Sequence, residues 1–508
     1  MRSTMSHYNP VSRMSSDTGI HSVPEYSFPS PQNCFLASEN AIYDYGNLYG
    51  FARKFRLFYR DHCENGSKVA LISDSSDLQV FLIASCWLAG IPFTVLSSAL
   101  PKDRLKQQVE IMNPGLIYCE EKFDSLFSNR LILTPDKISI SVNESSDTSY
   151  FSVPDHNRVF GWFFTSGSVS KPKLVPLKRR QVLYAARANE QNFRPATDTY
   201  WLLCLPLNHI GGISIILRSL LYGNAIYRMN RFSIEHVTNF LTENKLVEAA
   251  SLVPTMLHRL LEDTQFRTHK SLKAILLGGG PVSPELINKA LVRGIPIVLS
   301  YGMTETCAQI AANPLLKPSG TYSPKASAGK IFSPNRIQIR NDNGKVLKNN
   351  EPGLIWLKGP QVFDGYFDKK ANKHTFDSNG WFNTGDYGHV NSQDYLFIES
   401  RRSDLIITGG ENVNPVEIEQ ELKTFGEVSD AAVIGVPDEE WGEKVVAIVV
   451  MDPSVDLEEK THSFKSRLNK KLSGFKIPKE FFCLKKLPRT DTGKLQRNLL
   501  KKNYPDFT

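Results

Sequence analysis

Cysteine is scarce in this sequence and follows no recognisable spacing. The seven cysteines are scattered from Cys34 to Cys483, without a CxxC pair or a Cys/His arrangement of the kind that binds zinc. Disulfide-rich and zinc-binding classes depend on such spacings, so the pattern excludes both. Dispersed thiols in odd number are typical of a reducing compartment, and we expect a cytoplasmic protein.

Long apolar runs are equally scarce. The longest, Val80 to Leu96, contains Gly90 and Pro92, which interrupt it before it could cross a bilayer. It is better explained as a buried helix followed by a buried strand, and we expect no membrane span. Residues 1–30 are rich in Ser, Pro and Tyr and contain no apolar core of a secretory signal. We expect a disordered extension there.

Charge of one sign is also limited. The formal net charge is +8 over 508 residues, and no block of like charge is long enough for a nucleic-acid-binding arm. We therefore expect no nucleic-acid partner, whereas a mild positive excess is compatible with an anionic small ligand. The composition is that of a globular protein, and the length predicts more than one domain.

Strand and helix patterns alternate from about residue 40 to residue 400. The stretch "SKVALISD" is β-rich, "SDLQVFLIASCWLAG" is helical and "IPFTVL" is again β-rich. Such alternation predicts parallel α/β architecture, while short strands between Ala328 and Ile398 predict a smaller β-rich part. We expect an α/β fold class: a large N-terminal domain of parallel α/β sheets plus a β-rich subdomain, residues 31–400, and a small C-terminal α/β domain, residues 401–508.

The stretch "TSGSVSKPK", Thr165 to Lys173, combines small residues, hydroxyls and lysines. Small residues let backbone N–H groups approach an anion, and the hydroxyls and lysines add donors and charge. The stretch is neither a Walker A loop nor a GxSxG elbow. By itself it fits either a phosphate-binding loop or a plain solvated loop.

Two motifs follow predicted strands. "LLGGGP", with Gly278 to Gly280, could admit a flat ring against the backbone or form a tight turn. "YGMTE" places Tyr301, Thr304 and Glu305 beyond a strand end, where α/β sheets bind ligands. Tyr301 could stack on a base, Thr304 could donate to a phosphate and Glu305 could hold Mg²⁺. The alternative is an ordinary strand end followed by a helix start.

Two motifs lie nearer the C-terminus. In "WFNTGDYGHV", Asp386 could accept hydrogen bonds from two ribose hydroxyls, or it could belong to a plain hairpin turn. "PRTDTGKLQR" places Lys494 after Gly493 in a basic stretch. A basic stretch of this kind fits a solvated surface as well as an anion-binding role.

The order of these motifs along the chain matches that of a known superfamily. With "TSGSVSKPK", "YGMTE", "NTGD", "RRSDLIITGGENVNPVEIE" and "PRTDTGKLQR" between Tyr43 and Leu500, the chain resembles the adenylate-forming superfamily of acyl-CoA synthetases, peptide-synthetase adenylation domains and firefly luciferase. The resemblance covers nearly the whole chain. It implies a mobile C-terminal lid and two half-reactions. A carboxylate and ATP give an acyl-adenylate and pyrophosphate, and a thiol, commonly that of CoA, then displaces AMP.

The resemblance also implies roles for matching residues, with ATP, Mg²⁺ and coenzyme A as cofactors and co-substrates. Lys494 reaches in from the lid, Thr304 touches the α-phosphate and the attacking carboxylate, and Glu305 binds Mg²⁺. The positions implied to contact pyrophosphate, adenine, ribose or the pantetheine path are Thr165, Ser166, Gly167, Ser168, Lys173, Gly278, Gly279, Gly280, Tyr301, Gly302, Asp386, Arg401, Gly409 and Gly410.

The chain departs from the superfamily pattern in three places. Ser400 stands before Arg401 where relatives usually have glycine, and Ser403 stands at the hinge where many carry Asp or Lys. A small polar residue can absorb a backbone rotation, so we expect Ser403 to be the pivot. Val169 replaces a common Thr and removes one hydroxyl donor from the opening loop.

The segment from Leu205 to Gly223 lies where the superfamily builds its acyl pocket. It contains His209 but no acid to pair with an amino-acid ammonium, which disfavours an amino-acid substrate. Arg218 sits on an apolar helical run, where an unpaired charge is costly. It could reach solvent, pair with a protein carboxylate, or bind a second substrate carboxylate.

Within the superfamily, "NHIGG…ILRSLLYG" is most similar to the ligases that activate 2-succinylbenzoate for menaquinone biosynthesis. This similarity implies that His209 and Arg218 hold the aromatic carboxylate while the aliphatic one is adenylated. The alternatives are a fatty or aryl acid, a carrier-protein thiol in place of CoA, and a non-catalytic nucleotide-binding regulator. The sequence leaves both a monomer and a homodimer open.

Overall fold

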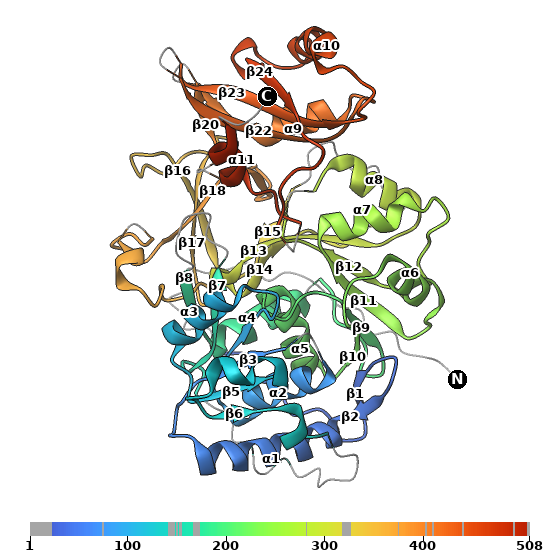
Figure 1. The fold of residues 1–508 in the computed structure, drawn as a ribbon, viewed down its shortest axis with the longest axis vertical. Helices are drawn as coiled ribbons and strands as arrows, with labels where there is room; N and C mark the ends of the chain where they lie inside the picture. The colour runs from blue at the N-terminus through green and yellow to red at the C-terminus, as the bar shows by residue number, and fades with distance from the viewer. Residues whose placement is uncertain are drawn as a thin grey trace, which may run out of the picture.

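The computed structural model describes residues 23–73, 76–140, 148, 151, 155–165, 173–190, 192–280, 282–316, 327–373, 375–401, 404–408, 411–438, 441–490 and 493–504. Within these ranges the strands form four sheets. Figure 1 shows two of them, with their helices, in the lower part of the view and the C-terminal sheet at the top.

The largest sheet has nine strands in the order β15-β14-β13-β12-β11-β9-β10-β1-β2. They are β1 (Cys34–Ala37), β2 (Ile42–Asp44), β9 (Tyr200–Leu203), β10 (Ala225–Arg228), β11 (Val247–Leu252), β12 (Ala274–Leu277), β13 (Ile297–Met303), β14 (Ala308–Ala312) and β15 (Lys330–Ile331). The central strands from β1 to β13 are parallel, and β2, β14 and β15 are antiparallel edges.

Helices cover both faces of this sheet. Because successive strand residues point to opposite faces, Ile275 packs into one apolar cluster and Leu276 into the other. The first cluster lies under α6 (Ile234–Glu243), α7 (Pro254–Glu262) and α8 (Pro284–Val292), and the second under α4 (Arg179–Glu190) and α5 (Ile210–Tyr222). Burial on both faces explains the continuous apolar runs of these strands.

A six-stranded sheet has the order β6-β5-β3-β4-β7-β8. Its strands are β3 (Val69–Ile72), β4 (Phe93–Leu96), β5 (Leu116–Cys119), β6 (Ile132–Leu133), β7 (Val159–Thr165) and β8 (Lys173–Lys178), accompanied by α1 (Tyr45–His62), α2 (Asp77–Ala89), α3 (Lys102–Met112) and the short 3-10 helices Glu121–Phe127 and Pro135–Lys137. The apolar run from Val80 to Leu96 forms α2 and β4, as the sequence predicted. Gly90 ends α2 in the left-handed conformation.

The remaining sheets form the β-rich part and the C-terminal domain. The first is antiparallel: β16 (Arg336–Arg340), β17 (Gly353–Lys358), β18 (Phe382–Val390) and β19 (Leu396–Arg401). The second comprises β20 (Ile406–Thr408), β21 (Glu411–Val413), β22 (Val428–Asp438), β23 (Gly442–Met451) and β24 (Glu480–Cys483), with α9 (Pro415–Lys423), α10 (Leu457–Asn469) and α11 (Arg497–Asn503). The predicted α/β fold class is confirmed.

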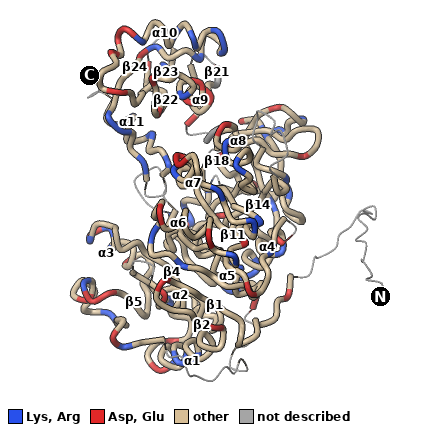
Figure 2. Tube along the Cα trace, turned by 90° about the vertical axis from the view of Figure 1, so that its right-hand side faces the viewer, with Lys and Arg blue, Asp and Glu red and all other residues tan. Residues whose placement is uncertain are grey.

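Charged groups tie the C-terminal domain together. Arg497 of α11 donates to both carboxylate oxygens of Glu419 in α9, at 2.6 and 2.7 Å, and to Asp404 at 3.2 Å. Figure 2 shows Lys and Arg residues along the stretch that includes α11. Acidic and basic residues alternate over the rest of the trace, in keeping with the modest net charge.

Residues 23–30 pack against the N-terminal domain. The ring centroids of Tyr26 and Tyr222 lie 6.5 Å apart, and the Tyr49 hydroxyl donates to the Pro29 carbonyl at 2.7 Å. The prediction of a disordered extension is therefore wrong for residues 23–30, because aromatic contacts with α1 and α5 hold them. Residues 1–22 lie outside the described residues.

The cysteines and the helices bear on the expected compartment and on membrane insertion. All seven cysteines are free thiols. Among the described residues, no helix has both the length and the apolar character that a membrane crossing requires.

Candidate active site

The "YGMTE" motif forms a tight corner between the antiparallel strands β13 and β14. Tyr301 and Gly302 end β13, and Thr304 and Glu305 lie in a short 3-10 helix, Thr304–Thr306. A Cβ at Gly302 would lie 1.8 Å from the Ala308 carbonyl oxygen, so only glycine fits there. Strained backbone follows directly: Cys307 and Ala308 both have positive φ, 52° and 72°. Strain of this kind gathers at functional sites.

Tyr301 and Asp386 meet at this corner. The Tyr301 hydroxyl donates to Asp386 Oδ2 at 2.7 Å, and both residues are buried. Asp386 lies on β18, directly opposite Arg401 of β19 in the strand register. The structure therefore brings together Tyr301, predicted to stack on adenine, and Asp386, predicted to bind the ribose. The strand position of Arg401, predicted to lie near the same sugar, is next to Asp386.

Lys173 and Glu305 lie on either side of a residue that the motifs did not single out. The Tyr366 hydroxyl donates to Glu305 Oε1 at 2.7 Å, and Lys173 Nζ lies 4.4 Å from the centre of the Tyr366 ring. Thr165 and Lys173 are paired at the loop end of the β7–β8 hairpin. The loop between them, with Ser166, Gly167, Ser168 and Val169, lies outside the described residues.

Glu305 has the character of a magnesium ligand. Its second carboxylate oxygen accepts no hydrogen bond from the described residues, although the residue is buried, with an exposed fraction of 9%. No group of three His, Cys, Asp or Glu side chains suited to a metal occurs within the described ranges. Mg²⁺ commonly binds through one or two carboxylates, substrate phosphates and water. A single carboxylate that shares a tyrosine contact with Lys173 is therefore compatible with this ion.

The three glycines lie at the end of β12, next to the "YGMTE" strand. A Cβ on Gly278 would lie 2.7 Å from Ser300 Oγ, and Gly279 has a φ of +83°. Close packing therefore favours glycine at position 278, and the left-handed backbone favours it at position 279. Gly280 has only ordinary contacts, with Pro254 at 3.8 Å.

The turn that carries Lys494 is docked on the N-terminal domain. A Cβ on Gly493 would lie 2.6 Å from Oγ1 of Thr255 in α7, so the backbone of the turn packs closely against the Thr255 side chain. Within the turn, the Lys494 amide donates to the Thr490 hydroxyl at 3.1 Å and Arg489 donates to the Gly493 carbonyl at 2.9 Å. The predicted hinge Ser403 and the glycines Gly409 and Gly410 lie outside the described residues.

Arg218 is buried in α5 and has no anionic partner among the residues that the structure describes. Its exposed fraction is 5%, one guanidinium nitrogen donates to Ser214 Oγ at 2.8 Å, and NH1 has no partner within the described part of the chain. Burial lowers the pKa of Arg218. Burial also raises the pKa of the neighbouring Cys307 thiol to about 12 and that of Tyr222 above its usual value. Neither group therefore supplies a negative charge near neutral pH.

The guanidinium of Arg218 lines a small apolar cavity between α4, α5 and the strained corner. Its other lining residues are Val182, Ala185, Ala186, Ile210, Ser214, Leu217 and Cys307. The Cys307 amide donates to the Thr304 carbonyl at 3.0 Å, so this cavity borders the predicted reaction centre.

His209 lies at the start of the same helix, as the residue that caps α5. The Arg218 head reaches back to the level of Ser214, so the two polar groups are about five helical residues, roughly 7.5 Å, apart along the axis. They could contact one ligand from two positions, although no direct contact joins them.

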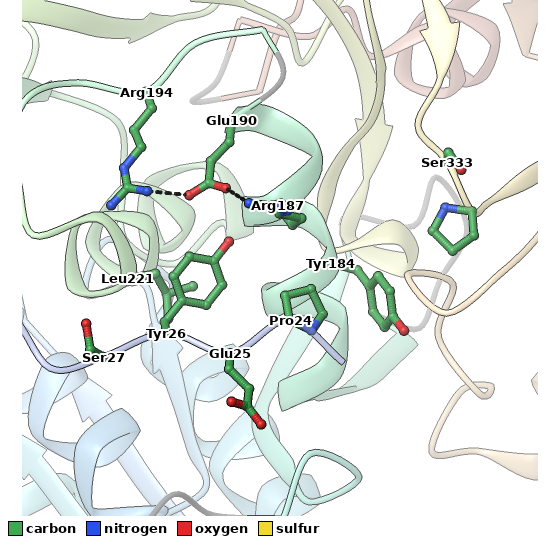
Figure 3. Close-up of a pocket in the computed structure, with 11 residues that line it drawn as sticks. Pro24, Glu25, Tyr26, Ser27, Tyr184, Arg187, Glu190, Arg194, Leu221 and Ser333 are labelled. Atoms are coloured by element: carbon green, nitrogen blue, oxygen red, sulfur yellow. Dashed lines mark hydrogen bonds and ion pairs between the residues drawn. The ribbon is translucent and has the colours of Figure 1, made fainter. Parts of the chain in front are cut away.

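A larger hollow of about 570 Å³ lies on the outer side of α4. Figure 3 shows Glu190 between Arg187 and Arg194, with Tyr26 and Tyr184 nearby. The two arginines pair with the glutamate, and none of the predicted site residues lines this hollow. The β13–β14 corner, where the predicted residues meet, is therefore the candidate active site.

Sequence motifs missed Tyr366, Thr255, Ser214 and Cys307. Tyr366 and Thr255 carry no local signal of chemistry, because a tyrosine and a threonine near a helix or turn are commonplace. Ser214 stood four residues before Arg218, a spacing that brings side chains together on a helix. That spacing was the one available signal.

The two-domain α/β architecture, together with the contact between the "YGMTE" and "NTGD" motifs, defines an adenylate-forming enzyme. The AMP-binding enzyme family model matches residues 30–367, and the AMP-binding enzyme C-terminal domain model matches residues 417–494. The chain belongs to the AMP-binding enzyme family, and the predicted membership of the adenylate-forming superfamily is confirmed.

Individual relatives match from about two thirds to nearly all of the chain. 2-Succinylbenzoate–CoA ligase of Bacillus subtilis strain 168 is 32% identical over 473 residues, 93% of this chain and 95% of the relative. The corresponding ligase of Listeria monocytogenes serotype 4b strain F2365 is 38% identical over 351 residues, 69% and 71% of the two chains.

Solved structures agree with these relatives. The B. subtilis o-succinylbenzoate CoA synthetase, in complex with its acyl-adenylate intermediate, superposes with a TM-score of 0.81 at 30% identity, covering 93% of this chain and 96% of the other. ATP-bound MatB of Rhodopseudomonas palustris has a TM-score of 0.84 at 24% identity over 94% and 96% of the two chains, and it shares the fold.

Proposed function

We propose that this protein is an ATP-dependent acid–CoA ligase that activates 2-succinylbenzoate. Relatives named for this reaction support the proposal over nearly the full length of the chain. The observation that carries the choice of acid is Arg218, buried in the acyl region without a carboxylate partner among the described residues.

In the first half-reaction, an oxygen of the aliphatic carboxylate attacks the α-phosphorus of ATP. The bond to pyrophosphate breaks, and pyrophosphate leaves. Two anions must meet in this step, so cations and fixed dipoles have to offset their repulsion. In our proposal, Tyr301 stacks on adenine, Asp386 binds the ribose, and Thr304 donates to the α-phosphate. Lys494 contributes a positive charge from the C-terminal domain.

The phosphate end of the nucleotide lies, in this proposal, beside both Lys173 and Glu305. Glu305 would hold Mg²⁺, and the charge of a bound Mg²⁺ would neutralise the phosphate oxygens as pyrophosphate departs. Lys173 would offset the charge of the phosphate oxygens, while Glu305 would stay available to the metal.

In the second half-reaction, the CoA thiol attacks the acyl carbonyl and the bond to AMP breaks. The proton of the thiol is lost, and acyl-CoA and AMP are released. Superfamily resemblance implies a lid rotation between the two steps, with Ser403 as its pivot and Gly409 and Gly410 along the pantetheine path. These three residues lie outside the described ranges.

The aromatic carboxylate of the substrate supplies the anion that Arg218 lacks. A carboxylate beside the guanidinium would pair with a charge that is otherwise costly to bury, and His209 would approach it from the start of α5. A fatty acid has no group for this position, so burying Arg218 would then have no compensation. All seven cysteines are free, which supports a reducing compartment such as the cytoplasm.

A panel of acids tests the proposal. The protein is incubated with ATP, Mg²⁺ and CoA together with 2-succinylbenzoate, 4-oxo-4-phenylbutanoate, benzoate or palmitate, and AMP release is measured. We expect 2-succinylbenzoate to have the highest kcat/KM. Preference for palmitate or benzoate would overturn the choice of acid. AMP release that required a phosphopantetheine carrier protein in place of CoA would overturn the choice of acceptor.

A further inference from the structure

Residues 361–367, between β17 and the 3-10 helix Lys369–Asn372, connect the β7–β8 hairpin to the 3-10 helix that contains Glu305. The Gln361 side-chain amide donates to the Thr306 carbonyl at 2.8 Å, and the Phe363 amide donates to the Glu305 carbonyl at 2.9 Å. At the other end, the Phe367 amide donates to the Leu174 carbonyl of β8 at 2.9 Å. The segment is thus fastened at both ends.

Tyr366 lies between these two attachment points. Its hydroxyl contacts a carboxylate and its ring contacts an ammonium group. Its hydroxyl donates to Glu305 Oε1 at 2.7 Å, and its ring faces Lys173 Nζ at 4.4 Å from the centroid. Tyr366 itself is buried, with an exposed fraction of 8%. Neither Lys173 nor Glu305 forms an ion pair within the described part of the chain.

We propose that Tyr366 is a positioning residue that keeps the Glu305 carboxylate and the Lys173 ammonium apart and directs both at the metal-bound pyrophosphate. A lysine and a glutamate this near a shared ring would otherwise pair directly, and each would then be lost to the substrate. One carboxylate oxygen is held by the hydroxyl, which leaves Oε2 for the metal. The lysine is held by the ring face through a cation–π contact.

This inference rests on the proposed function, because it assumes that Glu305 binds Mg²⁺ beside the phosphates of ATP. Hydrogen-bond partners of metal-ligating carboxylates orient them, and losing such a partner weakens metal binding by about tenfold or more. Tyr366→Phe removes only the hydroxyl and keeps the ring, so it separates the carboxylate contact from the lysine contact.

The test measures metal binding directly. Mn²⁺ replaces Mg²⁺ as the probe, and its binding to the full-length protein with α,β-methylene-ATP is followed by electron paramagnetic resonance, without any acid present. We expect Tyr366→Phe to bind Mn²⁺ about tenfold more weakly and Tyr366→Leu to be at least as impaired. With 2-succinylbenzoate, raising Mg²⁺ should restore the adenylation rate of Tyr366→Phe towards wild type.

The matched control is Tyr59→Phe in α1. It removes a tyrosine hydroxyl that donates to the Ser67 carbonyl at 2.7 Å. Figure 1 shows α1 at the bottom of the view, away from β13 and β14. Wild-type Mn²⁺ affinity in Tyr366→Phe, or equal weakening in Tyr59→Phe, would overturn the inference. If the wild-type protein binds Mn²⁺ with the nucleotide but turns over no acid, the proposed function fails while the role of Tyr366 stands.

Discussion

The hydroxyl of Tyr301 donates a hydrogen bond to the carboxylate of Asp386 at 2.7 Å, across 85 positions of sequence. The two side chains have exposed fractions of 9% and 4%. A hydrogen bond to a charged acceptor in such surroundings is stronger than a neutral one. The ring proposed to stack on adenine and the carboxylate proposed to bind ribose therefore behave as one preformed unit.

Tyr301→Phe should weaken ATP binding and leave acid binding nearly unchanged. The ring can still stack on adenine, but Asp386 loses the donor that fixes its rotamer. Hydrogen bonds to charged groups contribute about 1.5–3 kcal/mol, so we expect the KM for ATP to rise about tenfold or more. Adenylation rates over a range of ATP concentrations measure this. Tyr387→Phe, on the same strand, removes a hydroxyl bonded to the Pro352 carbonyl and serves as control. An unchanged KM for ATP in Tyr301→Phe would contradict the coupling.

Arg218→Met should separate substrate recognition from stability. Loss of a buried charge partner predicts that kcat/KM for 2-succinylbenzoate falls by about a hundredfold. The analogue 4-oxo-4-phenylbutanoate lacks the ring carboxylate, so its kcat/KM should change little. Removal of an unpaired buried charge should also raise the midpoint of thermal unfolding in the absence of substrate. Equal losses with both acids would show that Arg218 does not bind the second carboxylate.

Lys494→Ala should slow one half-reaction only. A preorganised charge that stabilises the adenylation transition state predicts a loss of about a hundredfold in acyl-adenylate formation. Thioester formation from supplied acyl-adenylate and CoA should remain near wild type. Pyrophosphate release and CoA-thioester formation are measured separately, with Lys502→Ala as a control on the exposed side of α11. Equal loss of both steps would refute the division of labour.

Gly493→Ala should impede docking of the Lys494 turn on the N-terminal domain. The new Cβ would lie 2.6 Å from Thr255 Oγ1 at a position whose φ is +80°. The left-handed conformation alone costs an alanine about 1–2 kcal/mol, which predicts adenylation about tenfold slower, with thioester formation spared. Adding Thr255→Ala should restore part of the rate by removing the clash.

The control for this pair is Gly426→Ala, where the added Cβ meets open space. Its adenylation rate should equal that of wild type. If Thr255→Ala restores nothing in the Gly493→Ala background, then the contact between the two domains does not limit adenylation.

Much of the fold could be predicted from pattern because burial on both faces of a parallel sheet leaves continuous apolar runs. β11, β12 and β13 are such strands, and the helices between them carry one apolar face. The ordered part of residues 23–30 could not be predicted, since its stability comes from Tyr26 and Pro29 meeting side chains far along the chain. Short polar-rich segments carry no local sign of such contacts.

The sequence alone determined the superfamily and the chemical groups available for binding and catalysis. The order of the motifs identified the superfamily, and the residue types at Tyr301, Glu305, Asp386 and Lys494 suit nucleotide, metal and anion. These properties are local, because a carboxylate or an aromatic ring keeps its chemistry wherever the chain places it.

Only the tertiary structure decided which groups meet and which charges stay unpaired. It joined Tyr301 to Asp386, inserted Tyr366 between Lys173 and Glu305, and buried Arg218 without an anion among the described residues. Such relationships depend on the crossing of strands and helices that are distant in sequence. They arise from packing and from the cost of burying charge, neither of which a motif records.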